Sequence, residues 1–221
     1  MSILELILNF YPPCDCRTIS PRKARTDGKQ LVMISLPASR TALILIDLQK
    51  GIVRRPVVPF TGEVVVERSQ KLAARFRAAG SLVILVNVAF APDFADAVRT
   101  EVDRPLSPPA GGFAPDWTEL VEGLAKPTDL LVTKRQWGAF YGTGLDLQLR
   151  RRGIETVVIG GIATNMGVES TARAAHEHGY GVVIAEDLTA TFSEAMQRFA
   201  CDNIFPMLGR VTTSDLITLA A

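Results

Sequence analysis

The sequence has little cysteine, little histidine and no excess of charge of either sign. Its 221 residues include three cysteines and two histidines, and 24 Lys and Arg stand against 23 Asp and Glu. Three cysteines are too few for the disulfide framework of a secreted domain. We therefore expect a reducing, cytoplasmic location. A balanced charge provides no general attraction to nucleic acid or to an anionic membrane. We therefore expect a small-molecule partner.

Long apolar runs are also missing. The first apolar run is short, is interrupted by Glu5 and follows no basic segment, so it fits neither a signal peptide nor a membrane span of roughly 20 apolar residues. Residues 1–38 are rich in basic side chains and lack periodicity. We predict that they form a poorly ordered N-terminal extension, and that residues 39–221 form one domain. Because Met33 stands just before the first strand-like run, the extension could also be a dispensable arm or a start-site artefact.

Metal ligands are scarce. Cys14 and Cys16 lack the partner pair that a four-ligand structural site needs. The two histidines, His176 and His178, are two residues apart and so point to different faces of a helix. We predict no metal and no cofactor.

What the sequence does have, from Thr41 onward, is an alternation of short β-branched runs with longer amphipathic stretches, which is typical of parallel strands joined by crossover helices. Six strands are predicted: Ala42–Ile46, Leu82–Val88, Leu130–Val132, Thr156–Ile159, Gly181–Ala185 and Arg210–Thr212. Four helices lie between them: Val64–Ala79, Leu145–Arg152, Val168–His178 and Ser193–Phe205. This order predicts a three-layer, Rossmann-like α/β fold, with helices on both faces of a mostly parallel six-stranded sheet.

Residues 91–128 interrupt the alternation with several prolines and the pair Gly111-Gly112. Loops of this length in compact domains are usually binding segments or flexible connections. No second core-sized segment needs a linker, so we interpret this stretch as a partly structured flap near the ligand site.

Ligands of open parallel sheets bind beyond the carboxyl ends of the strands. Two charged residues and one turn lie at such strand ends in this sequence. Asp47 ends one apolar run and Lys134 ends another, while the turn 160–170 joins a buried strand to a helix. Each has a plainer interpretation: a strand-end Asp often forms a turn, lysines are mostly exposed, and a glycine-rich turn can serve close packing alone. The turn also offers free N–H groups that favour negative charge.

Three motifs together resemble the isochorismatase-like, or cysteine hydrolase, family. They are ALILIDLQ at 42–49, KRQWGAFYGTGLDLQLRRR at 134–152 and GGIATNMGVESTARAA at 160–175. The resemblance runs from about Thr41 to the last predicted strand. It is strongest with small bacterial members of unassigned substrate, and it implies a homo-oligomer.

The resemblance implies that Asp47 is an acid or base and that Lys134 stabilises charge. Gly167 stands where amidase members carry a nucleophilic cysteine, so acyl transfer through a thioester is not expected here. Isochorismatases proper resemble this pattern, because they have the aspartate and the lysine with a glycine at the nucleophile position. Their reaction protonates a vinyl ether, for which a general acid is sufficient. The resemblance therefore implies a hydrolase of a small molecule that uses Asp47 and Lys134 without a cysteine nucleophile, with acid-catalysed hydrolysis of a vinyl ether as its reaction. The predicted substrate-binding residues are Gln49, Trp137, Phe140, Ile162, Ala163 and Thr164.

Two other hypotheses remain. The chain could be a non-catalytic ligand-binding or scaffold member of the fold, or an amidase with a nucleophile displaced to Ser170 or Cys201. Cys201 falls inside a predicted helix, where a cysteine more often acts as a small core residue.

Overall fold

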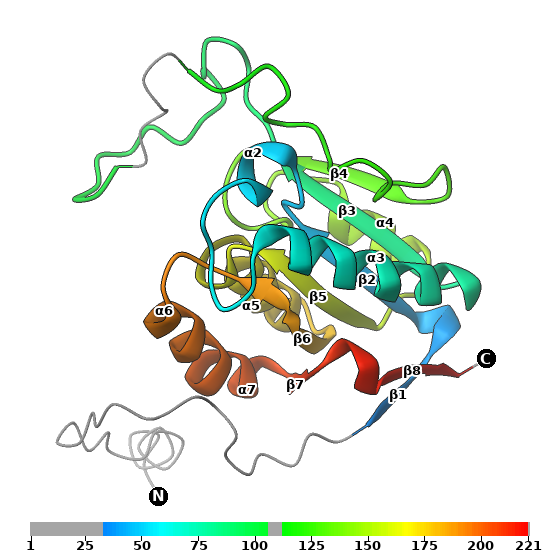
Figure 1. Ribbon diagram of the computed structural model, residues 1–221. Coiled ribbons are helices and arrows are strands. Elements are labelled where there is room, and N and C mark those ends of the chain that lie inside the picture. The colour runs from blue at the N-terminus through cyan, green and yellow to red at the C-terminus, as the bar shows by residue number, and fades with distance from the viewer. Residues whose placement is uncertain (1–32, 106–111, 221) are drawn as a thin grey trace, which may run out of the picture. The chain divides into compact units, whose positions relative to one another are not determined.

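The computed structural model describes residues 33–105 and 112–220 (Figure 1). Most of the predicted N-terminal extension, with Cys14 and Cys16, lies outside these residues. Among the helices of the described ranges, none is long and apolar enough to cross a membrane.

The centre of the domain is a six-stranded sheet in which every pair of neighbours is parallel. The strand order is β4-β3-β2-β5-β6-β7, so β2, which comes first along the chain among these six strands, lies in the middle. The strands are β2 (Thr41–Ile46), β3 (Leu82–Val88), β4 (Leu130–Lys134), β5 (Thr156–Ile162), β6 (Gly181–Ala190) and β7 (Arg210–Thr212). All their carboxyl ends therefore meet at one edge.

Helices cover both faces of this sheet, with α3 on one face and α4 and α5 on the other (Figure 1). The helices are α2 (Lys50–Val53), α3 (Gly62–Ala78), α4 (Leu145–Arg151), α5 (Glu169–Glu177), α6 (Glu194–Phe199) and α7 (Phe205–Leu208). Two π-helical turns, η2 (Thr164–Val168) and η3 (Ala200–Ile204), precede α5 and α7, and the short 3₁₀ segments are η1 (Ala38–Arg40) and η4 (Ser214–Leu216). The three-layer α/β fold is thus confirmed.

Strand β2 is buried along its whole length and divides the core into two halves. Leu43 and Leu45 pack toward Phe76 and the rest of α3. Ile44 and Ile46 pack on the opposite side, with the apolar side chains of α4 and α5. Because successive side chains of a strand point to opposite faces, a continuous apolar run is what a strand covered on both sides requires.

The predicted strands are all present, but three continue further than predicted. Strand β4 continues to Lys134, β5 to Ile162 and β6 to Ala190. Glycine made the end of β5 look like a loop, although Gly160 and Gly161 lie within the strand, where a side chain would collide with Leu188 and with the Ile46 carbonyl respectively. The glycines are needed there for close packing.

Regular structure begins before the predicted domain boundary at residue 39. Residues Ile34–Pro37 form strand β1, which pairs in parallel with β8 (Ile217–Ala220) in a separate two-stranded sheet. Ile34 and Leu36 are buried in the core. Each of these strands has only four residues, which is too short to stand out in the sequence, and each pairs with a segment far away along the chain.

The described part of 91–128 contains no helix or strand, in agreement with the loop prediction. Its C-terminal portion lies against α2. Leu120 forms a bridge with Gln49, and Glu119 and Asp116 pair with Lys50 and Arg54 respectively. This portion is therefore fixed next to the residues that follow Asp47.

Strand β1 can be tested by comparing a chain that begins at Met33 with one that begins at Ser39. We expect the shorter chain to be less stable by about 3 kcal/mol or more, because it loses the burial of Ile34 and Leu36, at roughly 1.5–3 kcal/mol for each fully buried side chain. Urea unfolding gives the two free energies of unfolding. Equal values would contradict the assignment of β1 to the domain core.

Candidate active site

Asp47 follows the last residue of β2 and lies at the carboxyl edge of the sheet. Its φ angle of 53° is in the left-handed region, which a non-glycine residue adopts at an energetic cost. Its backbone N–H donates to the Val86 carbonyl of β3 at 2.8 Å, so this conformation is held by the neighbouring strand. The carboxyl group consequently points inward and is only 6% exposed.

Lys134, the last residue of β4, reaches the same point from the edge of the sheet. Strand β3 lies between β4 and β2, and the long lysine side chain spans that width. Its Nζ donates to Asp47 Oδ2 at 2.8 Å and to the Gln136 carbonyl at 3.1 Å. Lys134 is 2% exposed, so the two groups form a buried ion pair.

The second carboxyl oxygen of Asp47 has no partner. Oδ1 is buried and accepts no hydrogen bond from any described residue. Desolvation by burial raises the pKa of Asp47 from its usual 3.8 to about 6, although the charge and hydrogen bond of Lys134 act in the opposite direction. Since Lys134 occupies Oδ2, a proton on this carboxyl belongs on Oδ1.

Gly167 lies directly beside the carboxyl group of Asp47. It belongs to the π-helical turn η2, which joins β5 to α5. A Cβ at this position would be 3.2 Å from Asp47 Oδ2, 3.4 Å from the Trp137 carbonyl and 2.8 Å from Ile46 Cγ2. The structure therefore brings Asp47, Lys134 and Gly167 together, and the space at Gly167 is too tight for a side chain unless Ile46 shifts.

The hydroxyl groups near Gly167 are bound to other groups. Thr171 Oγ1 donates to the Gly167 carbonyl at 2.6 Å and accepts from the Ala139 N–H at 3.2 Å. Thr164 Oγ1 donates to Gln197 Oε1 at 2.5 Å. They connect the turn to the loop after β4 and to α6, so they hold Gly167 in place.

Gln49 connects two segments of the backbone. Its side chain is fully buried and makes three hydrogen bonds to backbone groups: Nε2 donates to the carbonyls of Val88 and Trp117, and Oε1 accepts from the Val88 N–H. These three hydrogen bonds occupy the side chain within the chain itself, and the role of Gln49 in orienting substrate stays a prediction. Gln49 ties the flap to the end of β3.

The other predicted binding residues divide into two groups. Trp137 is half exposed and presents its carbonyl to Gly167, which is consistent with a place at the site. Phe140 is buried and stacks on His178 at 5.1 Å between ring centroids, on the α5 side of the sheet. Ile162 and Ala163 are buried in the α3 half of the core, where their side chains serve packing.

Gln197 and Asn165 were missed by the sequence interpretation. Gln197 binds Thr164 and also donates to Thr189 Oγ1 at 2.9 Å, and Asn165 Oδ1 accepts from Thr191 Oγ1 at 2.5 Å. Asn165 lies inside the recognised turn motif, whereas Gln197 comes from a separate helix with no local signal. The hydrogen bonds of these two residues hold the end of β6 and helix α6 next to the turn.

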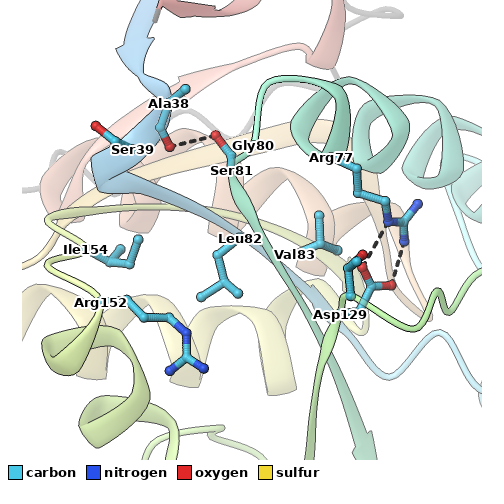
Figure 2. Close-up of a pocket in the computed structure, with 11 residues that line it drawn as sticks. Ala38, Ser39, Arg77, Gly80, Ser81, Leu82, Val83, Asp129, Arg152 and Ile154 are labelled. Atoms are coloured by element: carbon cyan, nitrogen blue, oxygen red, sulfur yellow. Dashed lines mark hydrogen bonds and ion pairs between the residues drawn. The ribbon is translucent and has the colours of Figure 1, made fainter.

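The opposite edge of the sheet carries a hollow of about 450 Å³ (Figure 2). Ser39, Ser81 and Asp129, which line it, precede strands β2, β3 and β4, so the hollow lies at the amino ends of the strands. The Asp129 carboxylate accepts two hydrogen bonds from Arg77, at 2.9 and 2.7 Å. The one carboxylate among the residues that line the hollow is therefore neutralised by an arginine. The hollow lies at the opposite edge of the sheet from Asp47.

Among the described residues, no group of three or more His, Cys, Asp or Glu side chains could hold a metal ion. The one cysteine that these residues include, Cys201, is buried. Its Sγ lies 3.4 Å from Gln197 Nε2, in the core rather than beside Asp47.

Comparison with known proteins agrees with the motifs. The family model "Isochorismatase domain" matches residues 41–215. The uncharacterized isochorismatase family protein YecD of Escherichia coli O157:H7 is 47% identical over 186 residues, which cover 84% of this chain and 98% of that protein. A solved structure of an isochorismatase family protein from Burkholderia thailandensis has a TM-score of 0.80 at 47% identity, and the match covers 84% of this chain and 96% of that one.

A relative with a named activity is more distant. The ureidoacrylate amidohydrolase RutB of Methylorubrum extorquens is 32% identical over 203 residues, which cover 81% of this chain and 82% of that protein. The family model spans most of the chain, and the relatives match the same region. The chain therefore belongs to the isochorismatase family.

Proposed function

We propose that this isochorismatase-family hydrolase uses Asp47 as a general acid on a small-molecule vinyl ether, without a cysteine nucleophile. The observation that supports this most directly is the unpartnered, buried Oδ1 of Asp47, whose carboxyl group lies beside Gly167. A general acid must hold a proton that it can release, and a carboxyl whose pKa is raised toward neutrality meets that requirement.

The reaction follows from these groups. The O–H bond of the Asp47 carboxyl breaks as its proton goes to the terminal carbon of the enol ether, and an oxocarbenium ion forms. Water adds to that ion and gives one proton back to the Asp47 carboxylate. The resulting hemiketal then breaks its C–O bond, which releases a carbonyl compound and an alcohol. Lys134 stabilises the Asp47 carboxylate while it is ionised.

Amide hydrolysis, the activity named for RutB, fits this site less well. That route requires a nucleophile, and position 167 is a glycine whose surroundings leave little room. The candidates for a displaced nucleophile are poorly placed. Cys201 is buried in the core, and Ser170 lies against Gly138.

The pH dependence of turnover tests the acid role. The acid form of Asp47 is the active one, so kcat/KM for a vinyl ether such as isochorismate should be high below pH 6 and fall as the pH rises through about 6. Asp47→Asn should lower kcat/KM by about 100-fold or more, since general acids contribute roughly 10² to 10⁴. Lys134→Met removes the charge that lowers the Asp47 pKa, so the falling limb should move to higher pH.

Steady-state rates from pH 4.5 to 9 on the three proteins give these profiles. A matched surface control is Lys71→Met, because Lys71 pairs with Glu67 on the exposed side of α3. The acid role would be abandoned if Asp47→Asn kept the wild-type limb near pH 6.

Position 167 distinguishes acid catalysis from a latent amidase. We expect Gly167→Ala and Gly167→Cys to lower vinyl-ether turnover to a similar extent, by about tenfold or more, because either Cβ presses on Ile46 and on the Asp47 carboxyl. Neither variant should hydrolyse ureidoacrylate or form an acyl-enzyme detectable by intact-mass spectrometry. An acyl adduct on Gly167→Cys alone, with amide turnover, would show that only the thiol is missing.

A further inference from the structure

Helix α6 buries a polar side chain where a helix on a protein core normally buries an apolar one. Gln197 is its buried residue, at 7% exposure, whereas Met196 and Phe199 of the same helix are exposed. A buried carboxamide costs free energy unless its oxygen and its N–H groups are bound. The position of Gln197 is therefore explained by the groups that it binds rather than by packing.

Gln197 binds three side chains. Its Oε1 accepts from Thr164 Oγ1 at 2.5 Å, and its Nε2 donates to Thr189 Oγ1 at 2.9 Å and lies 3.4 Å from Cys201 Sγ. Thr164 and Thr189 are both fully buried. Water is therefore not at hand to replace Gln197 as their partner.

The direction of these hydrogen bonds is fixed by the backbone. Thr189 Oγ1 donates its hydrogen to the Glu186 carbonyl at 2.8 Å, so it can only accept from Gln197. The amide nitrogen of Gln197 must then face Thr189, and the amide oxygen must face Thr164. The Thr164 hydroxyl is consequently the donor, and an apolar residue at position 197 would leave this buried hydroxyl unpaired.

One end of this chain of hydrogen bonds is anchored in the central sheet. Thr189 lies in β6, where it pairs with Gly161 of β5. Thr164, at the other end, is the first residue of the π-helical turn η2. Such turns depart from the regular bonding pattern of an α-helix and are frequent at functional sites. Gln197 therefore ties the start of an irregular turn to a rigid element.

The turn η2 covers the carboxyl group of Asp47. Gly167, within η2, is buried, and a Cβ on it would be 3.2 Å from Asp47 Oδ2. Thr171 ties the end of the turn to the loop after β4, because it donates to the Gly167 carbonyl and accepts from the Ala139 N–H. Gln197 holds the start of the turn. Loss of that contact would free the start of the turn and admit water to the carboxyl.

We propose that Gln197 is a positioning residue, which acts through Thr164 to hold the turn η2 on the Asp47 carboxyl, so that Gly167 keeps water from the acid. Lys134 is the charged group that acts on this carboxyl. Gln197 and Thr164 are uncharged, so they influence Asp47 through the access of water. The consequence for turnover rests on the proposed function, whereas the consequence for the Asp47 proton does not.

The titration of Asp47 measures this shielding without any substrate. Carbon-13 NMR of labelled aspartate carboxyl groups follows it, and Asp47→Asn identifies the signal. In the wild type the carboxyl should titrate with a pKa of about 6, because burial raises the pKa. In Thr164→Val and in Gln197→Met the midpoint should fall by about 1 pH unit, because water stabilises the ionised carboxylate.

Three further variants separate the hydrogen bond from general damage. The double variant of Thr164→Val and Gln197→Met should titrate like either single variant, since both break the same hydrogen bond. Thr164→Ser keeps the hydroxyl and should titrate as the wild type does. Thr41→Val is the matched control, because Thr41 is also fully buried, begins β2 at the end remote from Asp47, and has no partner for its Oγ1 among the described residues. It should leave the midpoint unchanged.

Turnover of a vinyl ether such as isochorismate gives a second measurement. The acid form of Asp47 is the active one, so a midpoint lower by about 1 pH unit should reduce kcat/KM by about tenfold at pH 7 and by much less at pH 4.5. A purely structural loss would reduce kcat/KM equally at both pH values.

An unchanged midpoint in Thr164→Val, or an equal fall in Thr164→Ser or in Thr41→Val, would overturn the assignment. If Gln197→Met does not fold, Thr164→Val alone decides, because it breaks the same hydrogen bond. A failure of the proposed function looks different. In that case the midpoint would still fall in Thr164→Val, but the wild type would not hydrolyse the vinyl ether.

Discussion

The buried ion pair of Asp47 and Lys134 is the interaction on which the site depends. Removing two charges from water is costly, and the loss of one partner from a buried pair costs about 3–5 kcal/mol. Here the pair is incompletely satisfied, because Lys134 binds only Oδ2 and leaves Oδ1 bare. A pair built for stability would satisfy both oxygens. The bare oxygen keeps the pKa of Asp47 high in spite of the adjacent cation, which is what an acid that donates its proton requires.

The fold supplies this pair through strand order. Asp47 ends the central strand β2, Lys134 ends the edge strand β4, and a parallel sheet brings both ends to one edge. Gly167 completes the arrangement from β5, on the other side of β2. Gln49 then joins the flap to this edge, because its side chain binds the backbone of Trp117 in the flap and of Val88 at the end of β3. The left-handed backbone of Asp47 turns its carboxyl inward at the point where these elements meet.

The sequence was sufficient for the sheet, its crossover helices and the three central positions of the site, because each depends on a local pattern: an apolar run, an amphipathic stretch or a residue at a strand end. It was insufficient where the cause is distant in the chain. Strands β1 and β8 stabilise each other from opposite termini, and the roles of Gln49 and Gln197 depend on partners far away in sequence. The surroundings of Phe140 depend on distant residues in the same way, since its ring packs on His178 at the end of α5.

Gly167 is best understood together with the charge of the site. A thiolate nucleophile beside Lys134 would be an anion that the lysine stabilises, and Asp47 would then act as its base. Without the thiol, the Asp47 carboxylate is the negative charge that Lys134 stabilises, and that charge disappears when Asp47 is protonated. The site is then positive in its acid form and neutral in its base form. A substrate that brings its own carboxylate binds the acid form preferentially, and by linkage it raises the pKa of Asp47 further. Under the proposed function, affinity for an anion and protonation of Asp47 are therefore coupled.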